Sequence, residues 1–173
     1  MPKKDKNTKN IYKEMWSLAD KIEKLTQTNR YDADMLLMAL HSQLNQLNYF
    51  YDTLVSKEPN NDPNSTFYNL RPNPKEHQLI YVELGRGYPK ELFDVHWCYL
   101  FKYCGTKLLI IPTTSLKATS STDKKDYYFD IKEESGNMCR LRLDEIRIVD
   151  KMRVVTKKLL EILKPNAVKL KMP

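Results

Sequence analysis

The chain has 173 residues, of which 41% are hydrophobic, and 29 basic against 22 acidic side chains give it a formal net charge of +7. This length allows one core of ordinary size with a smaller appendage, and the hydrophobic content indicates a folded chain. Three cysteines without CxxC spacing and three scattered histidines are not typical of a zinc site or a disulfide framework, so we expect a reducing compartment and no metal or other cofactor.

The excess of positive charge lies in the C-terminal part of the chain. Residues 71–173 hold 20 basic and 13 acidic side chains, an excess equal to the whole net charge. This balance favours a polyanionic partner, nucleic acid first, although a solvated basic surface would give the same count. The first ten residues, MPKKDKNTKN, lack the apolar segment of a signal peptide, and the longest apolar run, 108–112, is too short to span a bilayer. We therefore expect a cytoplasmic protein that contacts no membrane.

Two heptad patterns predict helices in the first third of the chain. Apolar residues alternate steps of four and three over residues 11–25 and again over 37–54, which places one apolar stripe along each helix. The polar segment 26–31 can turn the chain, and Asp32 can cap the second helix. We expect residues 1–57 to form an antiparallel helical hairpin that packs on the rest of the chain or pairs with a second copy as a coiled coil.

After the helices, the pattern changes to a linker and then to strands. Residues 58–77 contain four prolines among asparagines and an aspartate, which is typical of a linker. Beyond it, short segments rich in β-branched and aromatic residues predict strands at 78–84, 97–103, 107–111, 127–131, 138–143 and 145–149. Short strands with tight connections predict a small antiparallel barrel in residues 78–173, closed by a helix at 154–163. The predicted fold class is α+β.

The loop after the first predicted strand, GRGYPKELFDVHW, carries both signs of charge. Arg86, Lys90, Glu91 and His96 lie in it, so the loop could close over an anionic chain or could be a solvated connection. Its aromatic residues, with those of the next strand, could stack unpaired bases or belong to the core; they are Tyr88, Phe93, Trp97 and Tyr99.

Two further segments carry candidate functional side chains: one has three hydroxyl residues and the other has an arginine and an aspartate. The run IIPTTS brings Thr113, Thr114 and Ser115 to a strand end, where hydroxyls cap a turn or meet a ligand. Arg142 and Asp144 are two residues apart on an extended chain, so both would project from one face, as a surface salt bridge or as a catalytic pair. A cation, a carboxylate and hydroxyls together suit chemistry on a phosphodiester.

The order of these segments resembles the PemK/MazF/Kid family of small RNA-cleaving toxins. The family has a strand ending in Leu, a loop with a Glu, an Ile/Val-Pro-x-Thr-Ser strand and a strand that reads roughly Asp/Glu-Gln-x-Arg-x-Ile/Val-Asp. This chain has Leu84, Glu91, IIPTTS and DEIRIVD at 144–150, so the resemblance covers residues 78–163. It departs from the pattern where His96-Trp97 replaces Arg-Pro and where Glu145 replaces the usual Gln.

The resemblance implies an SH3-like barrel and a metal-independent endoribonuclease toxin of a toxin–antitoxin system. Such an enzyme cleaves single-stranded RNA through its 2′-hydroxyl and leaves a 2′,3′-cyclic phosphate. The family's acid–base pair and phosphate contact fall on this chain's expected catalytic residues, with His96 in place of the family's arginine: Arg142, Asp144, Thr114 and His96. The expected substrate-binding residues are Arg86, Lys90, Glu91, Ser115, Lys117 and Glu145. The expected partners are single-stranded RNA, a second copy in a homodimer and an antitoxin protein.

The departure at residue 96 leaves an alternative open. A histidine is cationic only part of the time near neutral pH, so it cannot replace an arginine fully. The alternative is therefore a catalytically weakened module that binds RNA or protein, with the N-terminal hairpin as a coiled-coil interaction segment.

Overall fold

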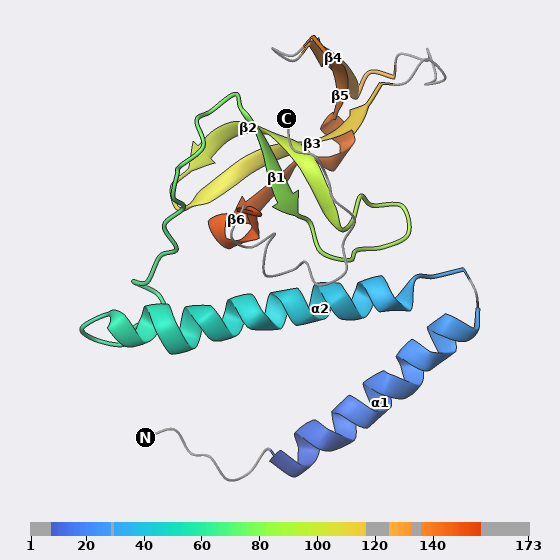
Figure 1. The fold of residues 1–173 in the computed structure, drawn as a ribbon, viewed down its shortest axis with the longest axis vertical. Coiled ribbons are helices and arrows are strands. Elements are labelled where there is room, and N and C mark those ends of the chain that lie inside the picture. Colours follow the sequence, from blue (N-terminus) through green and yellow to red (C-terminus); the bar gives the residue numbers. More distant parts are fainter. Residues whose placement is uncertain (1–7, 29, 117–124, 133–135, 157–173) are drawn as a thin grey trace. The chain divides into compact units, whose positions relative to one another are not determined.

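The computed structural model describes residues 8–28, 30–116, 125–132 and 136–156. It is α+β, with two helices followed by a six-stranded antiparallel sheet, as Figure 1 shows. The chain divides into two compact units, Met1–His41 and Ser42–Pro173. The fold class predicted from the sequence is confirmed at this level.

Both predicted helices are present. Helix α1 is Thr8–Gln27 and helix α2 is Ala33–Asn48, and α2 continues through the helical turns η1 (Tyr49–Leu54) and η2 (Val55–Lys57). Asp32 caps α2, because its Oδ1 accepts a hydrogen bond from the Met35 N–H at 2.9 Å. Packing of α1 against α2 as a hairpin stays a prediction.

The six predicted strands are also present, with ends that differ by a few residues. Their bounds are β1 Leu79–Glu83, β2 Val95–Cys104, β3 Lys107–Ser115, β4 Tyr128–Lys132, β5 Met138–Arg142 and β6 Arg147–Asp150. The order is β1-β2-β3-β5-β4, and β6 also pairs with β3. Residues 107–110 of β3 pair with β6 and residues 113–115 pair with β5, so β4 and β5 lie at one end of β3 and β6 at the other (Figure 1).

The predicted closure into a barrel is not seen. In the described part of the chain the sheet stays open, and the contact between β1 and the chain after β6 is one bridge, Val82–Val154, with one hydrogen bond from the Val155 N–H to the Tyr81 carbonyl at 2.8 Å. Residues 154–156 are not helical, although the start of a helix was predicted there, and the rest of that predicted helix, 157–163, lies outside the described residues.

The core lies between the strands and includes part of the predicted linker. It is formed by Leu70, Ile80, Val82, Leu84, Cys98, Leu100, Leu108, Ile110, Val149 and Val154. Leu70 is only 2% exposed, so the proline-rich segment 58–77 contributes to the core as well as connecting the helices to the sheet.

Candidate functional site

The loop between β1 and β2, residues 84–94, is held closed at its base. Its ends exchange a pair of backbone hydrogen bonds of 2.8 Å, with Gly85 and Asp94 both at positive φ. Arg86 forms a 2.7 Å ion pair with Asp94, and its guanidinium lies 4.5 Å from the centre of the Phe93 ring. The Arg86 side chain is 7% exposed. Arg86, predicted to bind substrate, therefore stabilises the loop from within.

A second ion pair binds this loop, near its end at Leu92, to the chain between β5 and β6. Glu145 lies in η3 (Leu143–Glu145), the helical turn between β5 and β6, and is 9% exposed. One of its carboxylate oxygens accepts a hydrogen bond from the Leu92 N–H at 3.1 Å, and the other pairs with Arg147 at 2.7 Å. Arg147 also donates to the Leu92 carbonyl at 2.8 Å. Both backbone polar groups of Leu92 are thus bound by this pair.

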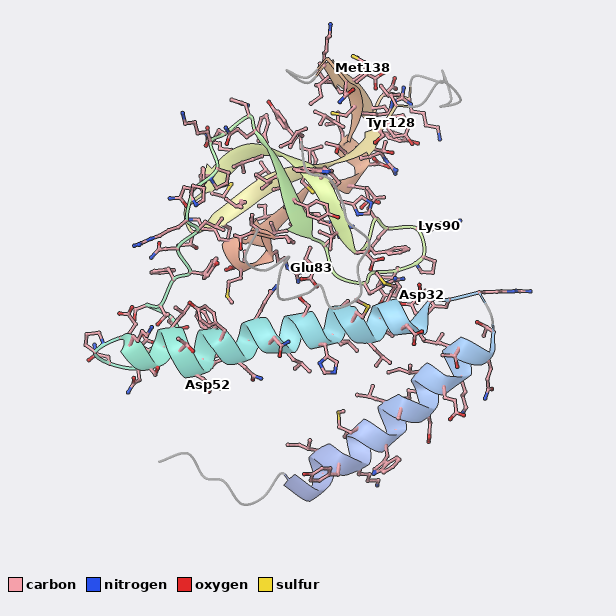
Figure 2. The ribbon with its side chains drawn as sticks, in the orientation of Figure 1. Asp32, Asp52, Glu83, Lys90, Tyr128 and Met138 are labelled. Carbon is pink, nitrogen blue, oxygen red and sulfur yellow. The ribbon has the colours of Figure 1, made fainter. Side chains whose placement is uncertain are left out.

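A pocket of about 590 Å³ lies between the loop and η3. It is lined by Lys90, Glu91, Asp144, Glu145, Ile146 and Arg147. Lys90 extends from the loop (Figure 2) and is exposed. Four residues predicted for the site from the sequence therefore meet at one pocket: Lys90, Glu91, Asp144 and Glu145.

Arg142 and Asp144 form a bidentate ion pair at the edge of this pocket. The Nε atom of Arg142 donates to Oδ1 of Asp144 at 2.8 Å and Nη2 donates to Oδ2 at 2.7 Å. The hydrogen bond from Arg142 holds the pKa of Asp144 below its usual value, and the same bond raises the pKa of Arg142. Asp144 lies in η3 and not on an extended strand, so the pair forms through the turn instead of through strand alternation.

The register of β3, β5 and β4 determines which residues share a face with Arg142. Thr114 pairs with Arg140, Asp130 pairs with Arg140, and Tyr128 pairs with Arg142. Residues directly opposite in an antiparallel pair lie on the same face, as do alternate residues of one strand, so these five residues share a face. Thr114 and Arg142 are diagonal neighbours there, and Thr114 is exposed.

Tyr128 lies close to both guanidinium groups of this face. Its ring centre is 5.0 Å from the guanidinium carbon of Arg140 and 5.3 Å from that of Arg142. Arg140 is also bound bidentately by Asp130, at 2.7 and 3.1 Å. Figure 2 marks Tyr128 on β4. The two arginines are therefore oriented by one aromatic ring and by one carboxylate each.

His96 is half-buried on β2. Burial lowers the pKa of its imidazole, and the nearby Asp94 charge opposes this shift. The charges of Arg147 and Glu145 also act on the ring, with opposite signs. His96 is therefore mostly neutral at neutral pH, and it lies close enough to the Glu145–Arg147 pair for both charges to act on its pKa.

The remaining predicted residues lie elsewhere. Ser115 follows Thr114 on an extended strand and points to the opposite face, where it pairs with Cys139. Lys117 lies outside the described residues. Trp97 packs on Tyr81, with ring centres 5.2 Å apart, whereas Tyr88 is 79% exposed. Of the predicted stacking residues, Tyr88 has the most accessible ring.

Some residues at the site were not predicted from the sequence. Arg140, Asp130 and Tyr128 share the face of Arg142, and Arg147 lines the pocket. The alternation in CRLR at 139–142 is the signal for Arg140, because residues two apart on a strand share a face. Asp130 and Tyr128 carried no such signal, since their position depends on the register between β4 and β5.

The comparisons with known proteins leave the family of this chain open. No model of a protein family matches the chain, and a search of curated proteins finds no match. Within the described ranges, no group of three His, Cys, Asp or Glu side chains is arranged to hold a metal ion. None of the helices in the described part of the chain has the length and apolar character needed to cross a membrane.

Proposed function

We propose that this protein is a metal-independent endoribonuclease that cleaves single-stranded RNA, as the toxin of a toxin–antitoxin system. The observation that supports this most is the Arg142–Asp144 ion pair, in which Arg142 shares a sheet face with the exposed Thr114 and Asp144 lines the pocket next to the loop. The resemblance of residues 78–163 to the PemK/MazF/Kid family adds to the proposal. On that resemblance we also propose the family's SH3-like arrangement of strands, a homodimer and an antitoxin partner.

In the proposed reaction the 2′-hydroxyl of the RNA attacks the adjacent phosphorus, and the bond to the 5′-oxygen breaks. A base takes the proton of the 2′-hydroxyl, and Arg142 stabilises the phosphorane charge and supplies a proton to the leaving oxygen. Thr114 would hold a phosphate oxygen. The products are a 2′,3′-cyclic phosphate and a 5′-hydroxyl.

Two residues are candidates for the base. Asp144 occupies the family's position, but its ion pair with Arg142 lowers its pKa and weakens it as a base. His96 has a neutral imidazole at neutral pH, which suits proton abstraction. The pH dependence of the cleavage rate distinguishes the two bases.

A second candidate function is RNA binding without cleavage. It is favoured by the same bidentate ion pair, because a carboxylate that accepts a hydrogen bond from an arginine at each oxygen is a weaker base. The phosphate would then be held by Thr114 and the cations around it, and the strand would stay intact.

The two functions are separated by incubating the purified protein with a long unstructured RNA in EDTA and mapping the RNA ends. We expect 2′,3′-cyclic phosphate ends, and about a 10²–10⁴-fold slower reaction for Asp144→Asn or Arg142→Ala. Thr114→Ala should also slow cleavage. The matched controls Thr106→Ala and Asp126→Asn change exposed residues in turns and should leave the rate unchanged.

The substrate provides the test of the chemistry. A single 2′-deoxy nucleotide at the scissile position should abolish cutting, because it removes the nucleophile. Undiminished cutting of that substrate would exclude the proposed reaction. RNA that stays full-length but is retarded in a gel would support binding without cleavage.

A further inference from the structure

Helix α1 presents a wide apolar face that the described residues of its own compact unit leave exposed. Three of its heptad residues are strongly exposed, at 54% for Ile11, 58% for Met15 and 50% for Leu18, whereas Ile22 is partly buried. Tyr12 and Trp16 widen the stripe beyond the heptad positions and are 68% and 74% exposed. An apolar face of this width is typical of a helix with neighbours on two sides, as in a helical bundle.

Helix α2 uses its polar side for the sheet. Ser42 donates a 2.8 Å hydrogen bond to the carboxylate of Glu83 at the end of β1, and Gln46 donates to the same oxygen at 3.2 Å. Glu83 is 7% exposed, so this contact is buried. The heptad residues Leu44 and Leu47 are 56% and 44% exposed. The apolar stripe of α2 is therefore left for something other than the sheet.

The exposed apolar area is large enough for a stable dimer. Nine large apolar side chains of the first compact unit are between 39% and 74% exposed: Ile11, Tyr12, Met15, Trp16, Leu18, Leu25, Leu37, Met38 and Leu40. At about 100 Å² each, they expose on the order of 1,000 Å². A monomer's largest apolar patch is about 300–600 Å², whereas a specific interface covers about 800 Å² on each partner.

The charges beside the stripe of α1 are self-complementary. Glu14 and Lys21 are exposed and seven residues apart, so they occupy the same heptad position on the same edge of the helix. When two copies of α1 lie antiparallel, this edge of one copy lies beside the same edge of the other copy, which runs in the opposite direction. Glu14 of one copy then faces Lys21 of the other, twice per dimer, as a two-fold axis requires.

We infer that the apolar faces of α1 and α2 are the surface through which two copies of this chain associate, with α1 of one copy antiparallel to α1 of the other. The helices lie outside the segment that resembles RNA-cleaving toxins, and the inference does not depend on the proposed reaction. It requires only the exposed stripes, their area and the paired charges.

The experiment measures the mass of the full chain by sedimentation equilibrium over a range of concentrations. We expect twice the mass of one chain. Leu18→Lys should raise the dimer dissociation constant about a hundredfold or more, because it puts a charge in the apolar stripe of both copies. Ser17→Lys introduces the same side chain one residue away, on the polar side, and should leave the dissociation constant within a few-fold of wild type.

The charge pair tests the orientation independently of helix stability. Glu14→Lys and Lys21→Glu should each weaken the dimer by several-fold, up to about tenfold, and the double variant Glu14→Lys/Lys21→Glu should restore it. A wild-type chain that stays monomeric at all concentrations would overturn the inference. A dimer unaffected by Leu18→Lys would exclude this surface, and single charge variants without effect would exclude the antiparallel pairing.

Discussion

The Glu145–Arg147 pair predicts a measurable loss of stability when Glu145 is replaced by alanine. The substitution removes the acceptor of the Leu92 N–H and the carboxylate that pairs with Arg147 at 2.7 Å. Hydrogen bonds to a charged group stabilise a fold by about 1.5–3 kcal/mol each, and Arg147 keeps some access to water. We therefore expect a loss of about 2–4 kcal/mol in the free energy of unfolding, or roughly 4–16 °C in Tm at about 2–4 °C per kcal/mol for a chain of this size.

The assay is urea unfolding followed by circular dichroism, together with limited trypsin digestion. Without the pair, the loop between β1 and β2 should open and trypsin should cut faster after the exposed Lys90. Glu58→Ala removes an exposed carboxylate after η2 and should change the unfolding free energy by less than about 0.5 kcal/mol. If Glu145→Ala behaves like this control, with unchanged cutting after Lys90, the pair does not hold the loop.

Two further measurements test the site and the core. If His96 is the base, the cleavage rate should rise with pH and reach a plateau, with the midpoint of the rise below about pH 6.5, because burial lowers the pKa of His96. A midpoint below about pH 3.9 would instead indicate Asp144, whose pKa is also lowered. A rate that rises only above pH 7 would contradict both assignments. In native protein one thiol, the exposed Cys104, should react quickly with Ellman's reagent, because Cys98 and Cys139 are buried and burial raises the pKa of Cys98 to about 12. All three should react in denaturant, and more than one fast thiol in native protein would contradict the packing described above.

Local signals in the sequence predicted local structure well. Asp32 was predicted to cap α2 and does so, because a cap depends only on the next few residues. Closure of the sheet into a barrel was predicted and is not seen, since closure depends on whether distant strand edges meet. Leu70 was assigned to a linker from the prolines around it, yet it is in the core. Proline and asparagine indicate an irregular backbone, which can still be buried.

The candidate site shows the same division. Alternation on a strand was the reason for expecting Arg142 and Asp144 together, and they do pair, but through the turn η3. The hydroxyls of Thr114 and Ser115 were expected to lie together at the site, although consecutive residues of an extended strand point to opposite faces. Tyr128 reaches Arg142 only through the pairing of β4 with β5, which the sequence pattern does not specify.

The ion pairs at the site decide how its charge should be understood. From the sequence, each arginine counts as a cation available to a phosphate. In the fold, four of them bind a carboxylate at 2.7 Å: Arg86 with Asp94, Arg140 with Asp130, Arg142 with Asp144 and Arg147 with Glu145. An RNA phosphate that contacts Arg142 must therefore compete with the bidentate Asp144, which is a strong partner. Cleavage requires that Asp144 take the proton of the 2′-hydroxyl although Arg142 weakens it as a base, or that His96 take that proton instead, whereas simple binding requires neither. The two proposed functions thus differ in whether one of these two groups takes a proton when RNA binds.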